Sequence, residues 1–180
     1  MLDSVIKLIE KISEFLNYRA ERQKSRFKEL IEPMYEALKA VHKDYLLIFE
    51  NCKKELESGQ NVKSIADALV FRRIEAETER RAILQQADTL MSIENIDDYK
   101  RFFSAVVNYF SRTPFSGAGT PSNLLRRAIS RAAEIRADDP LLGRSNEELL
   151  RSTEMILSLL RSNWEFLSAE YAKALARSIG

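Results

Sequence analysis

The sequence of 180 residues has one cysteine, one histidine, five glycines and four prolines. A single cysteine cannot form an internal disulfide, so a fold that depends on disulfides is excluded. A single histidine excludes the di-iron and di-manganese carboxylate bundles, which need two Glu-x-x-His motifs. It also leaves His42 as the one histidine available to a catalytic triad. The sequence contains no constellation typical of a catalytic or metal site, so we expect no enzyme, no cofactor and no metal.

Long apolar runs and an excess of charge of one sign are also missing. Charged residues interrupt segment 1–16 every few positions, so it is neither a bilayer-spanning helix nor the apolar region of a signal peptide. The formal net charge of +1 gives no general reason to expect nucleic acid or an anionic membrane as a partner. We therefore expect a cytoplasmic protein without a transmembrane segment.

What the sequence has in abundance is helical periodicity. With 45% hydrophobic and 31% charged residues and little glycine or proline, the composition favours helices. Apolar residues recur at alternating spacings of four and three, which predicts one long helix over 27–57. They are Phe27, Ile31, Met34, Leu38, Val41, Tyr45, Ile48 and Cys52, with Leu56 one position later than the strict pattern. Pro33 either kinks this helix or divides it, and Ser58 with Gly59 ends it.

Similar patterns predict further helices along the rest of the chain. Ser64 with Asp67 is a weak capping box for 62–91, and Ser145 with Glu148 is a proper one for a last helix to about Ser178. That last helix would turn Leu157, Leu160, Leu167 and Leu175 inward. Amphipathic patterns also cover residues 3–16, 96–110 and 120–136, and no segment alternates with the period of a strand.

The lengths and connections of these helices predict the architecture. The segments 27–57, 62–91 and 146–178 each have about 30 residues, or about 45 Å of helix, and the short turn 58–61 makes the first two an antiparallel pair. We expect an all-α fold: an elongated antiparallel four-helix-type bundle with coiled-coil-like packing and an additional N-terminal amphipathic helix. The chain would form one domain, with an amphipathic and basic helix at 1–26 and the bundle at 27–180.

Local basic patches are the main candidates for ligand contact. One patch at 17–28 and another at 124–136 could bind nucleic acid or another polyanion if the fold brought them together. Their arginines are Arg19, Arg22, Arg26, Arg126, Arg127 and Arg131. The glycine-containing loop 116–123 precedes a helix and could hold an anion or a nucleotide. It lacks the lysine of a phosphate-binding loop, and a simple connection is the plainer interpretation.

The remaining candidates favour structural roles or partner binding. His42 is expected to be half-buried and hydrogen-bonded beside Tyr45, and Cys52 to act as a small core residue. The aromatic residues Phe102, Tyr109 and Phe115 provide more aromatic surface than one small helix usually needs, and they would form an interaction surface. The leading hypothesis is a non-enzymatic module for protein–protein interaction or assembly, forming a homo-oligomer. The alternatives are a polyanion binder using the two basic patches and an anion-binding or nucleotide-binding protein using loop 116–123.

Overall fold

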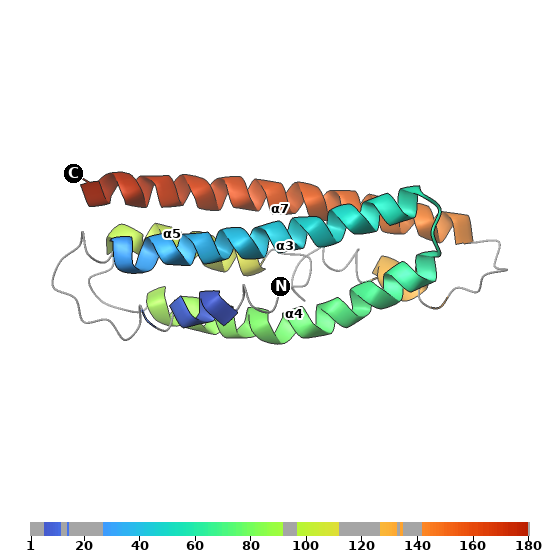
Figure 1. The fold of residues 1–180 in the computed structure, drawn as a ribbon, viewed down its shortest axis with the longest axis horizontal. Coiled ribbons are helices and arrows are strands. Elements are labelled where there is room, and N and C mark those ends of the chain that lie inside the picture. The colour runs from blue at the N-terminus through green and yellow to red at the C-terminus, as the bar shows by residue number, and fades with distance from the viewer. Residues whose placement is uncertain are drawn as a thin grey trace. The chain divides into compact units, whose positions relative to one another are not determined.

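The computed structural model describes residues 6–11, 14, 27–91, 97–111, 127–132, 134 and 142–179. The longer elements are η1 (Phe27–Ile31), α3 (Glu32–Glu57), α4 (Val62–Met91), α5 (Asp97–Ser111) and α7 (Leu142–Ile179). Residues 6–11 and 127–132 are helical as well, and the described residues include no strand. The helices bury their apolar faces against one another, so the predicted all-α bundle is confirmed (Figure 1).

The chain divides into two compact units. The first unit comprises Met1–Asp44, Glu79–Ser111 and Ser162–Gly180, and the second comprises Tyr45–Thr78 and Arg112–Arg161. Helices α3, α4 and α7 each contribute residues to both units, because their ranges cross the unit boundaries.

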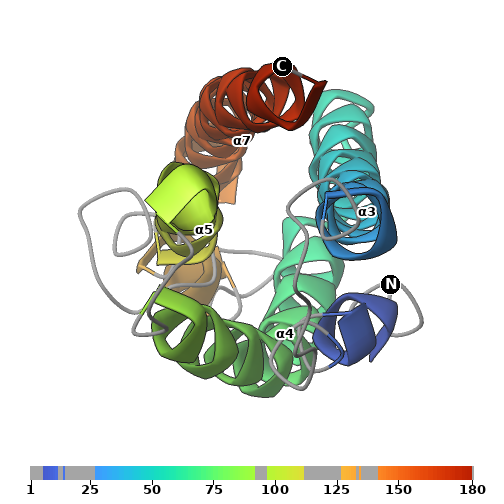
Figure 2. The same ribbon diagram turned by 90° about the vertical axis from the view of Figure 1, so that its left-hand side faces the viewer.

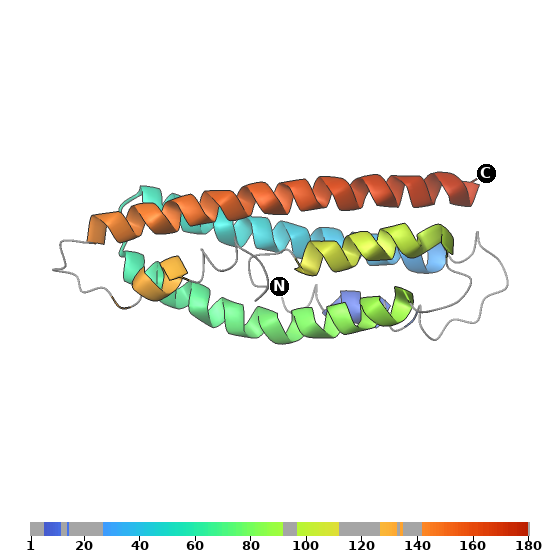
Figure 3. The same cartoon turned by 180° about the vertical axis from the view of Figure 1, so that it is seen from behind.

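The first unit has an aromatic core. Segments of α3, α4, α5 and α7 surround a common centre (Figure 2), and α5 lies beside the C-terminal part of α7 (Figure 3). The fully buried side chains include Leu38 from α3, Phe103 and Phe110 from α5, and Leu167 from α7. Leu8 is also fully buried, which is consistent with an N-terminal helix that packs through its apolar face.

The second unit packs the C-terminal half of α3 against α4 and the N-terminal part of α7. Two ion pairs join α3 to α7: the Lys53 Nζ atom lies 2.8 Å from Glu154, and an Arg161 nitrogen lies 3.1 Å from Glu50. Solvent screens both pairs, so they serve mainly to favour this register rather than to stabilise the fold.

The turn between α3 and α4 was predicted correctly. Gly59 has φ +73°, a left-handed conformation that glycine adopts without steric cost. The Gly59 and Gln60 amides donate to the carbonyls of Leu56 and Glu55, which closes the last turn of α3. The chain then reverses into α4, and within this unit the two helices are antiparallel (Figure 1).

Pro33 neither divides the long helix nor leaves it regular. Residues 27–57 are helical without interruption, and the first five form the π-helix η1. Pro33 lacks the N–H that would bond to the carbonyl of Glu29, and its ring crowds that carbonyl. A wider turn on its N-terminal side relieves this crowding, which explains why the π-helix lies there.

The predicted apolar stripe of α3 is wrong at one position. Ile48 is half-buried, whereas Phe49 is fully buried. A strict seven-residue repeat drifts by about 20° per heptad on a straight helix, so after three heptads the next residue faces the core. With Phe49 in place of Ile48, the buried stripe continues through Cys52 to Leu56, which is 1% exposed.

The predicted N-terminal caps of two helices are wrong. The start of α4 is capped by Asn61, whose side-chain oxygen accepts from the Lys63 amide at 3.0 Å, rather than by Ser64 with Asp67. Helix α7 begins at Leu142, so Ser145 lies inside it and does not open it. Leu175, expected to face inward, is 36% exposed, and the neighbouring Ala174 is buried instead.

Candidate binding site

The structure describes some of the predicted polyanion-binding arginines. Arg127 and Arg131 lie one turn apart on the helical segment 127–132, and both are exposed. The other four, Arg19, Arg22, Arg26 and Arg126, lie outside the described residues, as does the loop 116–123. The condition on which polyanion binding by both patches depends, that the fold brings them together, is therefore untested.

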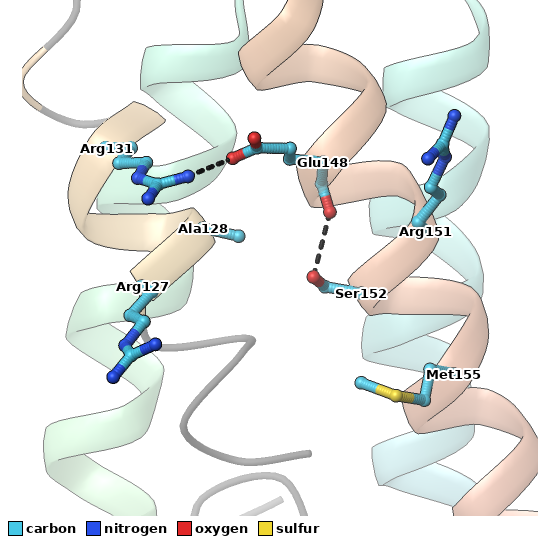
Figure 4. Close-up of a pocket in the computed structure, with 7 residues that line it drawn as sticks. All are labelled: Arg127, Ala128, Arg131, Glu148, Arg151, Ser152 and Met155. Carbon is cyan, nitrogen blue, oxygen red and sulfur yellow. Dashed lines mark hydrogen bonds and ion pairs between the residues drawn. The ribbon is translucent and has the colours of Figure 1, made fainter. Parts of the chain in front are cut away.

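Arg127 and Arg131 line a cavity of about 360 Å³ in the second unit. The cavity lies between the helical segment 127–132 and α7, and we call it the arginine groove (Figure 4). Its lining residues are Arg127, Ala128, Arg131, Glu148, Arg151, Ser152 and Met155. Met155 points from α7 toward the segment 127–132, whereas Arg151 points away from that segment (Figure 4).

Helical spacing explains why these side chains meet. Glu148, Ser152 and Met155 lie at positions i, i+4 and i+7 of α7 and so share one face. Arg127 and Arg131 are related in the same way on the facing segment. The Ser152 hydroxyl donates to the Glu148 carbonyl at 2.8 Å, so the polar group of this residue is satisfied within the helix.

Ion pairs engage part of the positive charge in the groove. Arg131 Nη1 donates to Glu148 Oε2 at 2.7 Å, and Arg144 Nε lies 3.6 Å from the other Glu148 oxygen. Arg151 lies 3.7 Å from Glu147. Arg127 makes no ion pair with any residue that the structure describes. Because Arg151 points away and pairs with Glu147, the charged groups where the two helices meet are Arg127, Arg131 and Glu148, with a formal charge of +1.

The contribution of α7 to this site was not predicted from the sequence. Glu148 was assigned to a helix cap, and Arg151 and Met155 were not selected. Their spacing of four residues places them on neighbouring turns of one helix. Only the packing of α7 against the segment 127–132 shows that this part of α7 meets Arg127 and Arg131.

The predicted aromatic interaction surface requires a correction. Phe102 and Tyr109 are each 1% exposed, so both rings lie in the core of the first unit and are not available on its surface. Phe115 lies outside the described residues. The amphipathic pattern of α5 explains the burial, because its apolar face is wide enough to be covered on both flanks.

His42 belongs to this aromatic core. Its ring stacks on Trp164 at 4.6 Å between centroids, and its Nδ1 atom is 2.9 Å from the Tyr109 hydroxyl. The predicted hydrogen bond is present, but the side chain is 7% exposed and thus more buried than expected. The contacts give His42 a structural role, since a buried polar ring needs a partner of this kind.

Further stacking continues along the interface between α3 and α7 in the first unit. Tyr35 stacks on Tyr171 with 3.8 Å between ring centroids, and its hydroxyl lies 3.0 Å from the Ser168 hydroxyl. Partial burial raises the pKa of Tyr171, and the negative charges of Glu32 and Glu36 raise it further. The Tyr171 hydroxyl therefore stays protonated at neutral pH and acts as a neutral polar group.

Cys52 is buried in the second unit, as predicted. Its Sγ atom lies 3.7 Å from the Thr153 hydroxyl, and the side chain is 4% exposed. Desolvation raises the pKa of the thiol from 9.0 to about 11, the hydrogen bond with Thr153 opposes this, and Glu55 adds to it. A thiol in this state is a poor nucleophile, because the reactive form is the thiolate.

The raised pKa of Cys52 predicts how stability depends on pH. The folded protein holds the thiol proton more tightly than the unfolded chain does, so this contribution is complete below pH 9 and lost between pH 9 and 11. Between about pH 8 and pH 10.5, the free energy of unfolding measured with urea should fall by about 2 kcal/mol more in the native protein than in Cys52→Ala. Equal losses in the two proteins would contradict the assignment.

No group of three or more His, Cys, Asp or Glu side chains within the described part of the chain could hold a metal ion. Of the helices that the structure describes, none combines the length and the apolar character needed to cross a membrane. Comparison of the chain with protein-family models, with curated proteins and with solved structures finds no match.

Proposed function

We propose that this protein is a non-enzymatic helical module for protein–protein interaction or assembly, and that the arginine groove is its binding site. The observation that carries the proposal is the composition of the groove. Arg127 and Arg131 lie beside the half-buried Met155 and the buried Ala128, so charged groups border apolar side chains. Protein interfaces commonly combine an apolar centre with a polar rim, and arginine and methionine are enriched in them.

Two reactive residue types have structural roles, which supports the non-enzymatic part of the proposal. His42 is hydrogen-bonded and stacked within the core, and the pKa of Cys52 is raised by burial. Enzymes generally place such groups in clefts with a pKa suited to proton transfer or nucleophilic attack. Neither residue lines the arginine groove.

Polyanion binding is the second candidate, and it rests on Arg127 and Arg131 lying on one helix face. A phosphate backbone attracts arginines spaced in this way. However, Glu148 lies in the groove and Glu147 pairs with Arg151, so carboxylates lie among the arginines. These carboxylates lower the density of positive charge that a phosphate backbone needs, and the half-buried Met155 offers an apolar contact that a phosphate backbone does not use, so we favour a protein partner.

Light scattering on a sizing column, with absorbance recorded at two wavelengths, tests these proposals. We expect a discrete species larger than one chain, with the absorbance ratio of a protein. Its mass should persist at moderate salt because apolar surface contributes to the interface. A monomer that retains no partner down to nanomolar concentration would contradict the proposal. A nucleic-acid ratio that disappears in high salt would favour polyanion binding.

A further inference from the structure

The arginine groove has a geometry that suits one class of partner. Arg127 and Arg131 are four residues apart, so their Cβ atoms lie about 6 Å from each other. Carboxylates at positions i and i+4 of another helix have the same separation. The groove can thus offer one guanidinium to each of two acidic side chains on a partner helix.

The apolar part of the groove complements this charge pattern. Ala128 lies between the two arginines in sequence and lines the groove, but it is 5% exposed, so Met155 supplies most of the accessible apolar surface. Met155 points into the same space from α7 (Figure 4). Its flexible thioether adapts to apolar side chains of different shape. An amphipathic helix in a groove uses apolar contacts of this type.

We propose that the arginine groove binds an acidic amphipathic helix of a partner protein. Two carboxylates one turn apart would pair with Arg127 and Arg131, and an apolar side chain between them would pack on Ala128 and Met155. This inference rests on the proposed function and adds the chemistry of the partner. Charge complementarity selects this occupant, since Arg127 and Arg131 outnumber Glu148 where the segment 127–132 meets α7.

Glu148 marks the place of one partner carboxylate. Its Oε2 atom accepts a hydrogen bond from Arg131 at 2.7 Å, and the Glu148 side chain is 32% exposed to solvent. A solvated ion pair of this kind is weak, so a partner carboxylate can replace it. Glu148 therefore competes with the partner for Arg131 and lowers the affinity of the free groove.

Fluorescence anisotropy with a synthetic peptide tests the inference. The probe is a fluorescein-labelled helical peptide of about 18 residues, long enough to form a helix, with glutamates at i and i+4 and leucines on the same face. The control peptide carries lysines in place of these glutamates. We expect saturable binding of the acidic peptide to the full-length protein and about tenfold weaker binding after Arg127→Glu with Arg131→Glu.

Further variants separate charge recognition from general damage. Arg101→Glu makes a single charge reversal of the same kind at an exposed position of α5 and should leave the affinity unchanged. The doubly reversed variant should bind the lysine peptide more tightly than the native protein does. Glu148→Gln should strengthen binding of the acidic peptide about threefold, because it removes the competing carboxylate.

The inference is overturned if the native protein shows no saturable binding of the acidic peptide, or if Arg101→Glu weakens binding as much as the groove variants do. It is also overturned if the doubly reversed variant keeps native affinity. If a single-stranded oligonucleotide displaces the labelled peptide at a lower concentration than the unlabelled peptide does, the partner is a polyanion and not an acidic helix. The proposed function itself fails only in the scattering experiment, by a monomer without a partner, so the two failures are distinguishable.

Discussion

Phe49→Ala should lower the free energy of unfolding by about 3–5 kcal/mol, because the substitution leaves a cavity where a fully buried ring now packs. Protein interiors are closely packed, so the surrounding residues can collapse only in part onto the space. Urea unfolding followed by circular dichroism should show a lower midpoint with an unchanged slope.

Ile48→Ala is the matched control for this prediction. Ile48 is the neighbour of Phe49 on α3 and is half-buried, so its replacement should cost roughly 1 kcal/mol. A larger loss of unfolding free energy for Ile48→Ala than for Phe49→Ala would mean that Ile48 faces the core, as the strict sequence pattern predicts. The pair of variants therefore tests which residue of α3 faces the core of the second unit.

Leu160→Asp should have an equally large effect on the second unit. Leu160 is fully buried on α7, and its replacement would place a carboxylate in an apolar environment. An unpaired buried charge is among the most destabilising changes known, and we expect a loss of about 4–5 kcal/mol or more. Thermal unfolding followed by circular dichroism measures the loss, or shows that the variant does not fold at all.

Ser158→Asp provides the control for this substitution. Ser158 lies two residues earlier on the same helix and is exposed, so a charge there should change stability by less than about 0.5 kcal/mol. Similar melting temperatures for Leu160→Asp and the native protein would mean that α7 presents a different face to the core. A large loss for Ser158→Asp would have the same meaning.

The helices themselves were largely predictable from local patterns. The range of α4 agrees with the prediction at both ends, and α5 is displaced by one residue. Periodicity and the turn at Gly59 are encoded within a few neighbouring residues, so they are readable without knowledge of the rest of the fold. The same holds for the burial of Cys52, which follows from its place in the stripe of α3.

The errors occurred where a local pattern had more than one physical outcome. Ser145 and Glu148 satisfy the capping-box pattern, yet α7 begins earlier and Glu148 pairs with Arg131 instead. Phe102 and Tyr109 could equally have been surface or core, because an aromatic face on a helix does not specify what covers it. The packing of α5 in the first unit buries them.

The sequence by itself determined that this protein is helical, that it has no internal disulfide, and where most of its helices begin and end. These properties depend on composition and on short-range spacing. Tertiary structure decided the partners of the exposed and buried side chains, including His42 with Tyr109 and Trp164, and the meeting of Arg127 and Arg131 with Met155 in the arginine groove. Such contacts join residues far apart in the chain, and helical periodicity specifies the face of a helix but not the helix that packs against it.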